Sequence, residues 1–296
     1  MSLELVLQYL VAGLTYGTIY AVVAVGFNII YNTTGIINFA QGEFVMLGGM
    51  TAVTLHGLVP LPLAIAGAVL VTMAVGALIE VLFIRSLSSP SVLRMIVITI
   101  GISILVREGA LLIWGESVRS LPYFTGDEVS SLSLGGVHVS PQVLWSLGAC
   151  LVIVAFLRVF FQHTSVGRQM RACAANRVAA ALCGVPTRNL VTLSFVLSAG
   201  IGALAGCVVS PITYTSYGIG TGLAIKGFTV AILGGLGNST AAVVAGFVMG
   251  ILESFSVSLL PTAYKDAISV AILLAILFVR PSGIFGSAEV ARLEAH

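Results

Sequence analysis

Long apolar stretches alternate with short polar ones along the chain, and this pattern predicts helices that cross a membrane. A helix that spans the hydrocarbon core of a bilayer needs about 20 residues, most of them apolar. Eight stretches are candidates for such spans: 5–31, 36–56, 62–84, 92–114, 143–161, 190–210, 240–260 and 266–280. A ninth apolar segment, 222–238, is short and interrupted by glycines, so it either crosses as a broken helix or re-enters.

The composition of the chain is that of an integral membrane protein. Of its 296 residues, 58% are hydrophobic and only 8% are charged, and the mean hydropathy is +1.11. A soluble domain carries about 25% charged residues. The net charge of +2 also excludes a nucleic-acid binder that works by neutralising phosphates. We therefore expect an all-α integral membrane protein, a single domain over residues 1–296 built as a polytopic helical bundle of about 8–9 segments.

Charged residues are distributed unevenly between the predicted loops, and this sets an orientation. The segments 85–94 and 158–188 carry arginines without acidic residues, whereas the loop 115–142 is acidic overall. Since positive residues stay in the cytoplasm, we expect 85–94, 158–188 and the C-terminus after Arg280 inside, and the N-terminus and 115–142 outside. Termini on opposite sides require an odd number of crossings, which favours counting 222–238 as one.

The outer loop 115–142 contains the pattern of a small β-hairpin. Residues 132–139 alternate around the Gly135-Gly136 pair, as two short strands do around a tight turn. Such a hairpin either receives a docking partner or belongs to a compact cap over the helix ends.

Signatures of catalysis are absent from the sequence. A P-loop needs a Gly-Lys-Ser/Thr run, but Lys226 and Lys265 follow Ile225 and Tyr264. No HExxH motif occurs among the four histidines, which argues against a zinc protease. We expect no catalytic residue, no metal site and no ATPase activity in this chain, and hence a protein that is not an enzyme.

Polar residues at the start of the 36–56 segment are the first candidates for a functional site. Asn38, Gln41 and Glu43 cluster there after a tight turn. A carboxylate within a membrane span is expensive and usually faces a cavity or a partner. The alternative is that Asn38 caps a helix and Glu43 lies at the headgroup boundary.

Four further charged residues lie close to or within the spans. Glu80 and Arg107 fall within about two turns of predicted helix ends, so we interpret them as anchors at the membrane interface. Lys226 and Glu253 lie inside apolar segments, and an ion pair between them would offset the burial of both charges.

Internal repetition is faint. Gly42-Glu43-Phe44 with Leu47-Gly48-Gly49 resembles Gly227-Phe228 with Leu233-Gly234-Gly235. Transporters often carry such paired broken helices at their substrate path, although two glycine-rich membrane segments can also look this similar by chance.

The segment 164–186 combines arginine with alanine, a strong helix former. Arg168 and Arg171 share one helical face. Three apolar residues recur at helical spacing after them: Val178, Leu182 and Val185. We expect an amphipathic cytoplasmic helix that either lies on the membrane or docks onto a soluble partner.

Four stretches connect the chain to a known family. They are NFAQGEF (38–44), GRQMRA (167–172), LGGLG (233–237) and RPSGIFG (280–286). In kind and order they make the chain resemble the permeases of branched-chain amino acid ABC transporters, LivH type.

The resemblance implies an alternating-access importer of leucine, isoleucine and valine in the bacterial inner membrane, surrounded by membrane lipid. Its partners would be a second permease of the LivM type, two cytoplasmic ATPases that bind ATP and Mg, and a periplasmic amino acid-binding protein. Its substrate path would pass near Asn38, Gln41, Glu43 and Lys226.

The resemblance also implies that the loop 162–188 holds a coupling helix that inserts into an ATPase. The residues implied in that contact are Gly167, Arg168, Arg171, Ala179, Ala180 and Gly184. Val178 stands where the corresponding loop of ABC importers has a glutamate, so the contact is expected to be more apolar or arranged differently.

Other functions remain as alternatives to this reading. Members of the family carry urea, amides or other amino acids, so a urea or amide importer is one alternative. A secondary transporter driven by Na⁺ or protons and a passive channel come from other classes, and neither needs an ATPase.

Overall fold

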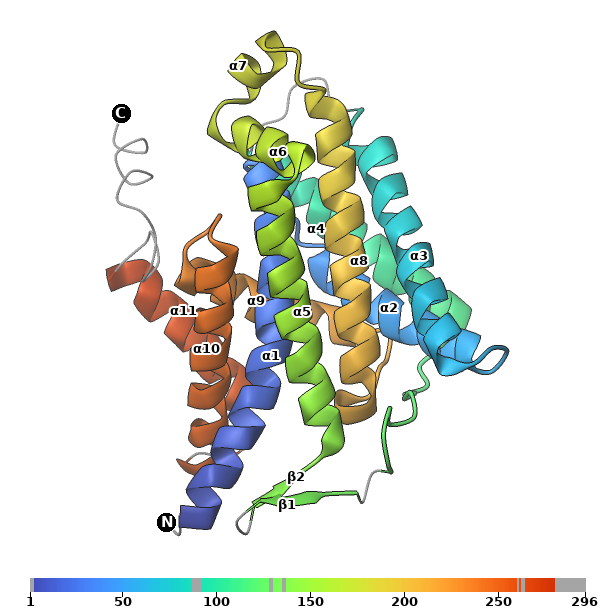
Figure 1. Ribbon diagram of the computed structural model, residues 1–296, viewed down its shortest axis with the longest axis vertical. Helices are drawn as coiled ribbons and strands as arrows, with labels where there is room; N and C mark the ends of the chain where they lie inside the picture. Colours follow the sequence, from blue (N-terminus) through green and yellow to red (C-terminus); the bar gives the residue numbers. More distant parts are fainter. Residues whose placement is uncertain are drawn as a thin grey trace.

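The computed structural model describes residues 3–86, 92–127, 130–134, 137–259, 261 and 264–279. Almost all of its elements are helices, arranged as an elongated bundle (Figure 1). In chain order they are α1 (Leu3–Thr34), α2 (Gln41–His56), α3 (Leu61–Ile79), the π-helical turn η1 (Glu80–Ile84), α4 (Val92–Trp114), β1 (Leu132–Leu134), β2 (Val137–Val139), α5 (Pro141–His163), α6 (Ser165–Ala175), α7 (Arg177–Leu182), α8 (Thr187–Thr213), α9 (Ile219–Gly234), α10 (Ser239–Leu259) and α11 (Lys265–Val279).

Among the described residues, six helices are long and apolar enough to cross a membrane: α1, α3 with η1, α4, α5, α8 and α10. Each coincides with a predicted span to within a few residues. Helices are expected for such sequences, because an α-helix satisfies the backbone N–H and C=O groups that lipid cannot. The last predicted span, 266–280, corresponds to α11, which has 15 residues.

The predicted span 36–56 is not one continuous helix. α2 begins only at Gln41 and has 16 residues, fewer than the roughly 20 that a bilayer needs. Gly35 follows α1 with a φ of +69°, and Asn38 Oδ1 accepts a hydrogen bond from the N–H of Ala40 at 3.2 Å. A side chain that bonds to nearby backbone competes with the helix, so the chain stays unwound from 35 to 40.

A long helix, a short helix and a long helix follow one another twice, as α1–α2–α3 and as α8–α9–α10. Both short helices have 16 residues and lie at middle height in the bundle (Figure 1). Each packs on the long first helix of the other half, α2 on α8 and α9 on α1. The structure therefore supports an internal repeat.

The register of this repeat differs from the sequence match. Counted from their first residues, α2 and α9 align Gly42 with Gly220, the second residue of each. The sequence pattern instead matched Gly42 with Gly227, which lies seven residues (227 − 220) further along. Two turns of helix separate the alignments, because glycines recur along α9 and short motifs fit at more than one place.

Glycines let α1 and α10 approach each other closely. A methyl group placed on Gly17 would lie 2.8 Å from Cα of Phe247, and one placed on Gly13 would lie 2.7 Å from Cα of Ile251. Small residues at such steps allow helix backbones to touch in a membrane, where packing rather than the hydrophobic effect joins helices.

The two ends of the bundle carry different structures. α6 and α7 lie at one end, and the hairpin β1–β2 lies at the other with the start of α1 (Figure 1). The predicted hairpin is confirmed, with Leu132 paired to Val139 in antiparallel register. The Gly135-Gly136 turn and the stretch from Arg280 onward lie outside the described residues.

The loop between α4 and α5 covers the end of α8. The N–H of Leu121 donates to Ser210 Oγ at 3.2 Å, and Gln142 Nε2 donates to the carbonyl of Val208 at 2.8 Å. A backbone bridge also joins Arg119 to Thr215, just beyond α8. These contacts favour the interpretation of this loop as a compact cap.

Glu80 is not the interface anchor that its position predicted. Its side chain is buried, and its Oε2 accepts a hydrogen bond from the hydroxyl of Thr192 on α8 at 2.6 Å. The π-helical turn η1 begins at this residue and closes with the N–H of Arg85 donating to the Glu80 carbonyl. Charge pattern alone could not show that the carboxylate faces α8.

Candidate functional site

The centre of the bundle is formed by the crossing of α2 and α9. A methyl group on Gly42 would collide with the carbonyl group of Gly220. The two helices therefore touch through backbone near their N-termini, where neither residue has room for a side chain. Short helices that meet inside a membrane bundle leave N-terminal N–H groups and polar side chains available to bind ions and polar solutes.

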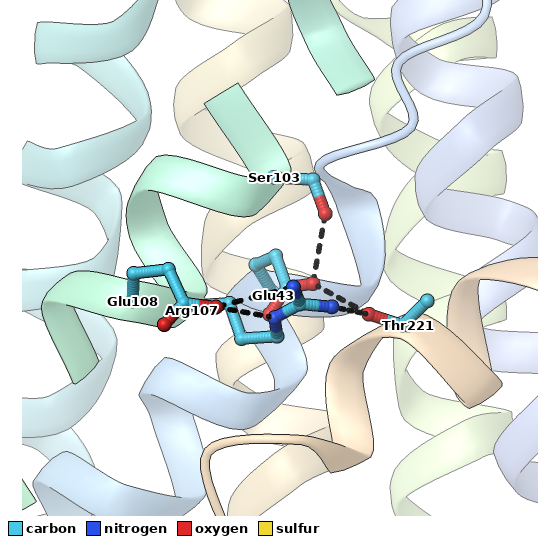
Figure 2. A network of polar contacts seen from close by, with 5 residues as sticks. All are labelled: Glu43, Ser103, Arg107, Glu108 and Thr221. Atoms are coloured by element: carbon cyan, nitrogen blue, oxygen red, sulfur yellow. Dashed lines mark hydrogen bonds and ion pairs between the residues drawn. The ribbon is translucent and has the colours of Figure 1, made fainter. Parts of the chain in front are cut away.

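Glu43 is the charged residue at this crossing (Figure 2). Its side chain is fully buried, and its Oε1 accepts hydrogen bonds from Ser103 on α4 at 2.9 Å and from Thr221 on α9 at 3.4 Å. Its Oε2 has no hydrogen-bond partner among the described residues. The carboxylate packs against Gly220 in the first turn of α9, at the positive end of that helix dipole. This burial favours the interpretation that Glu43 faces partners inside the protein rather than headgroups.

Arg107 extends from α4 toward the same crossing (Figure 2). Its Nη1 lies 3.5 Å from Thr221 Oγ1, and its Nη2 lies 3.1 Å from Glu108 Oε1. The side chain of Arg107 is 32% exposed, so solvent weakens the pair with Glu108. Arg107 is therefore more than the predicted interface anchor, because its guanidinium also contacts Thr221 in the polar network around Glu43.

Gln41 fastens the start of α2 to α8 and α1. Its Nε2 donates to the carbonyl of Ser198 at 3.3 Å, and its Oε1 lies within hydrogen-bond distance of the Ser198 hydroxyl. That hydroxyl also lies 2.9 Å from the carbonyl oxygen of Gly26 on α1. The amide is occupied at both ends, which fits a residue that holds the crossing in place.

Asn38 lies in the unwound chain before α2 and does not cap it. The N-cap residue is Ala40, which provides no side-chain hydrogen bond. Asn38 is fully buried, and its Nδ2 has no hydrogen-bond partner among the described residues. A buried donor without an acceptor is costly, so this amide is a candidate for binding a ligand.

Lys226 belongs to a second polar group, away from Glu43. Its Nζ lies 2.8 Å from Glu253 Oε1 on α10 and 3.3 Å from the hydroxyl of Tyr20 on α1. The predicted ion pair is confirmed. Five residues separate Thr221 from Lys226, which is about 140° around a helix. α9 therefore presents Thr221 to α2 and α4, and Lys226 to α1 and α10.

Sequence reasoning missed three residues of the site: Ser103, Thr221 and Ser198. Each is a single hydroxyl in an apolar helix, and such residues commonly bond to their own backbone. Only the fold brings Ser103 and Thr221 to Glu43, across sequence separations of 60 and 178 residues. Nothing in the sequence could have identified them.

The segment predicted as one amphipathic helix forms two, α6 and α7. Asn176 separates them, and its Oδ1 accepts a hydrogen bond from the N–H of Ala179 as the N-cap of α7. Gly167 packs against the end of α5, where a side chain would collide with the carbonyl of Phe160. The segment is thus fixed to the bundle rather than lying separately on the membrane.

The candidate coupling residues divide between an inner and an outer face. Gly167 and Ala180 are buried, whereas Arg168, Arg171, Ala179 and Gly184 are exposed. Gly184 ends the segment with a φ of +82°, a backbone conformation that glycine adopts easily. Two large apolar side chains of α7, Val178 and Leu182, are 72% and 85% exposed. Exposed apolar residues beside arginines are typical of a docking surface.

The described residues form a bundle with six helices able to cross a membrane and, within it, a charged crossing of two short helices. This arrangement is typical of a multi-pass membrane permease. The sequence pattern of the family described as branched-chain amino acid transport system / permease component matches residues 9–277. The chain belongs to this family.

Individual relatives agree with this assignment. The chain is 32% identical to the high-affinity branched-chain amino acid transport system permease protein BraD of Pseudomonas aeruginosa, with 97% of this chain and 98% of that protein covered. It is 33% identical to the permease protein LivH of Escherichia coli K12, with 97% of each chain covered. A probable LivH of Methanocaldococcus jannaschii is 26% identical, over 92% of this chain and 90% of its own.

A solved structure has a similar fold. PsaBC from Streptococcus pneumoniae in complex with Fab matches with a TM-score of 0.51 and 11% sequence identity, covering 98% of this chain and 96% of that one. At this identity the match supports the architecture of the bundle alone.

Proposed function

We propose that the chain is one permease half of an ATP-driven importer of branched-chain amino acids. The family match over residues 9–277 carries this proposal, together with relatives that bear this function in their names and align over 97% of the chain. The other components would be a second related permease, two cytoplasmic ATPases that bind ATP and Mg, and a periplasmic binding protein. Hydrolysis is assigned to those ATPases because the sequence contains no P-loop.

We also propose that the chain crosses the bacterial inner membrane nine times. Six long helices are supplemented by α11 and by the two short helices, each extended by its unwound leading segment, 35–40 and 214–218. The arginine-rich end with α6 and α7 would face the cytoplasm, and the end with the hairpin would face the periplasm. The N-terminus would then be periplasmic and the C-terminus cytoplasmic.

Cys183 offers a test of this orientation. It is an exposed free thiol just after α7, whereas Cys173 is buried and burial raises the pKa of its thiol. A maleimide that does not cross membranes should leave Cys183 unlabelled in intact spheroplasts and label it in inside-out vesicles. Labelling in intact spheroplasts would reverse the orientation, and a Cys183→Ser variant controls for the other thiols.

The substrate path is proposed to pass the α2–α9 crossing. A zwitterionic amino acid needs an acceptor for its ammonium group and donors for its carboxylate. Glu43 Oε2 and Asn38 Nδ2 are buried and lack partners within the described residues, so they can supply one of each. Gln41 would hold the start of α2 in place through its hydrogen bonds to Ser198 on α8. Lys226, paired with Glu253, would support the opposite side of α9.

ATPase coupling is proposed to occur through α6 and α7. The exposed Val178, Ala179 and Leu182 would enter the ATPase surface, with Arg168 and Arg171 beside them. Gly167 and Ala180 would fix the segment to the bundle, and Gly184 would end it with its left-handed turn. Leu182→Asp should leave the permease folded but reduce the amount of ATPase that purifies with it. Cys183→Ser, at the adjacent exposed position, should change neither.

Labelled leucine uptake tests the function itself. Cells lacking the gene should take up less leucine than the parent, and unlabelled valine should compete while urea should not. If leucine uptake is unchanged and urea uptake falls, the substrate assignment is wrong and a urea importer is supported. Leucine uptake by the purified chain alone in liposomes, without nucleotide, would instead indicate a secondary transporter.

A further inference from the structure

A cavity with a basic rim opens at the end of the bundle that carries α6 and α7. Its volume is about 340 Å³. It lies between the end of α1, the turn η1 and the starts of α4, α7 and α8. It is separate from the α2–α9 crossing, and none of the candidate path or coupling residues lines it.

Three arginines from three different elements line this cavity. Arg85 follows η1, Arg177 begins α7 and Arg188 lies in the first turn of α8. All three are exposed, and within the described part of the chain none of them forms an ion pair. Three positive charges thus converge on one cavity without a direct ion pair among the described residues.

Glu80 is the one carboxylate among the lining residues of the described chain, so it balances at most one of the three arginine charges. Its Oε2 accepts the Thr192 hydroxyl at 2.6 Å, and its side chain is only 2% exposed. The cavity therefore keeps an excess of positive charge at its open side. An arginine guanidinium binds a phosphate through two parallel hydrogen bonds, so a group of arginines favours phosphate over other anions.

The inner wall of the same cavity is apolar. It is formed by side chains such as Ile36, Ile84 and Met95. A free phosphate ion has no apolar part that could pack on such a wall. A lipid does, because it carries glycerol and acyl carbons beside its phosphate. Arg85 and Arg188 also stand at the ends of the two spans Leu61–Ile84 and Thr187–Thr213, at the depth where headgroups lie.

From this combination we propose that the cavity binds the headgroup of an anionic phospholipid. The lipid phosphate would be held by Arg85, Arg177 and Arg188, and its glycerol region would lie on Ile36 and Met95. Because Arg177 begins α7, a bound lipid would connect the spans α3 and α8 to the segment proposed to couple with the ATPase. The site requires lipid on the side of α7, whichever substrate the permease carries.

Native mass spectrometry of the full-length chain, purified in mild detergent with the subunits that accompany it, tests this proposal. Added phosphatidylglycerol should be retained roughly tenfold or more in preference to phosphatidylcholine. A triple variant, Arg85→Gln with Arg177→Gln and Arg188→Gln, should reduce retention of phosphatidylglycerol to the level of phosphatidylcholine. The same three positions changed to lysine should keep much of the preference, because the positive charge is kept. A monodisperse gel-filtration peak of the glutamine variant shows that its loss is not misfolding.

A matched control removes the same charge from the same end of the molecule. Arg158→Gln with Arg168→Gln and Arg171→Gln should leave the lipid preference unchanged, because these arginines do not line the cavity. Since Arg168 and Arg171 belong to the proposed coupling surface, lipid retention is compared between ions that carry the same subunits. Equal loss in both triple variants would overturn the proposal and indicate general surface attraction. Displacement of the lipid by millimolar inorganic phosphate would also overturn it and identify a free anion as the ligand.

Discussion

The two short helices α2 and α9 have the same length and equivalent places in the bundle, yet their charged residues are satisfied differently. Lys226 of α9 has Glu253 at 2.8 Å and Tyr20 at 3.3 Å. Glu43 of α2 has hydroxyl groups on one carboxylate oxygen and no partner among the described residues on the other. The charge of α9 is matched by a direct ion pair, while the carboxylate of α2 accepts hydrogen bonds from neutral hydroxyls and has Arg107 beside their network, joined to it through Thr221.

This difference suits the two charged residues, Lys226 and Glu43, to different tasks. A buried ion pair mainly holds helices in register, since its two opposite charges offset each other. A buried carboxylate with an unused oxygen retains the capacity to bind a cationic group. The third residues of the two helices, Glu43 and Thr221, even bond to each other across the crossing. The repeat thus places a carboxylate and a hydroxyl at equivalent positions of the two short helices, where they meet.

Blocking the contact between the two helices should have the largest effect on stability. In Gly42→Leu the side chain would collide with the backbone of Gly220, which cannot rotate away. We expect a loss of more than about 4 kcal/mol, so that little folded protein is recovered. The yield of monodisperse protein after gel filtration measures this. Gly222→Leu is the control, because Gly222 is exposed on α9 and has no neighbouring atom within 4 Å; equal loss there would contradict the crossing.

Removing the cation of α9 should have the next largest effect. Lys226→Met leaves the fully buried Glu253 without its ion-pair partner, and such a loss is typically about 3–5 kcal/mol. The apparent melting temperature in detergent should fall accordingly. Adding Glu253→Gln should restore most of the lost melting temperature, because the double variant has no unpaired buried carboxylate at this position. If the double variant is less stable than Lys226→Met, the pair is not the source of the effect.

Glu43→Gln should affect stability much less and transport much more. Glutamine still accepts hydrogen bonds from Ser103 and Thr221, so the expected loss of stability is about 1 kcal/mol or less. Leucine uptake should fall to background, while the ATPases should still purify with the permease. Normal uptake by this variant would remove Glu43 from the proposed substrate path.

Sequence patterning predicted the elements well wherever apolar length decided the outcome. The long spans and the hairpin follow from runs of residues that only one structure satisfies. It was less successful where a tertiary contact decides, as at Glu80. This residue lies near the end of a predicted span, but its carboxylate accepts a hydrogen bond from Thr192 on another helix. The Lys226–Glu253 pair was predictable because two opposite charges in apolar helices have few other solutions. The partners of Glu43 were not, because serine and threonine are unremarkable in apolar helices.

Thr221→Val should have the smallest effect on stability. It tests most directly whether α2 and α9 share a polar site at their crossing. It removes one donor 3.4 Å from Glu43 Oε1 and leaves the donor Ser103 at 2.9 Å in place. We expect a loss of about 0.5–1 kcal/mol, less than for Ser103→Ala, as judged from the melting temperature. If the hydroxyl acts on stability through the charge of Glu43, the loss should shrink when Thr221→Val is made in the Glu43→Gln background, because a hydrogen bond to a carboxylate is stronger than one to an amide. Additive losses would instead mean that Thr221 packs independently of Glu43, and the two halves would then meet at the crossing without sharing a polar site.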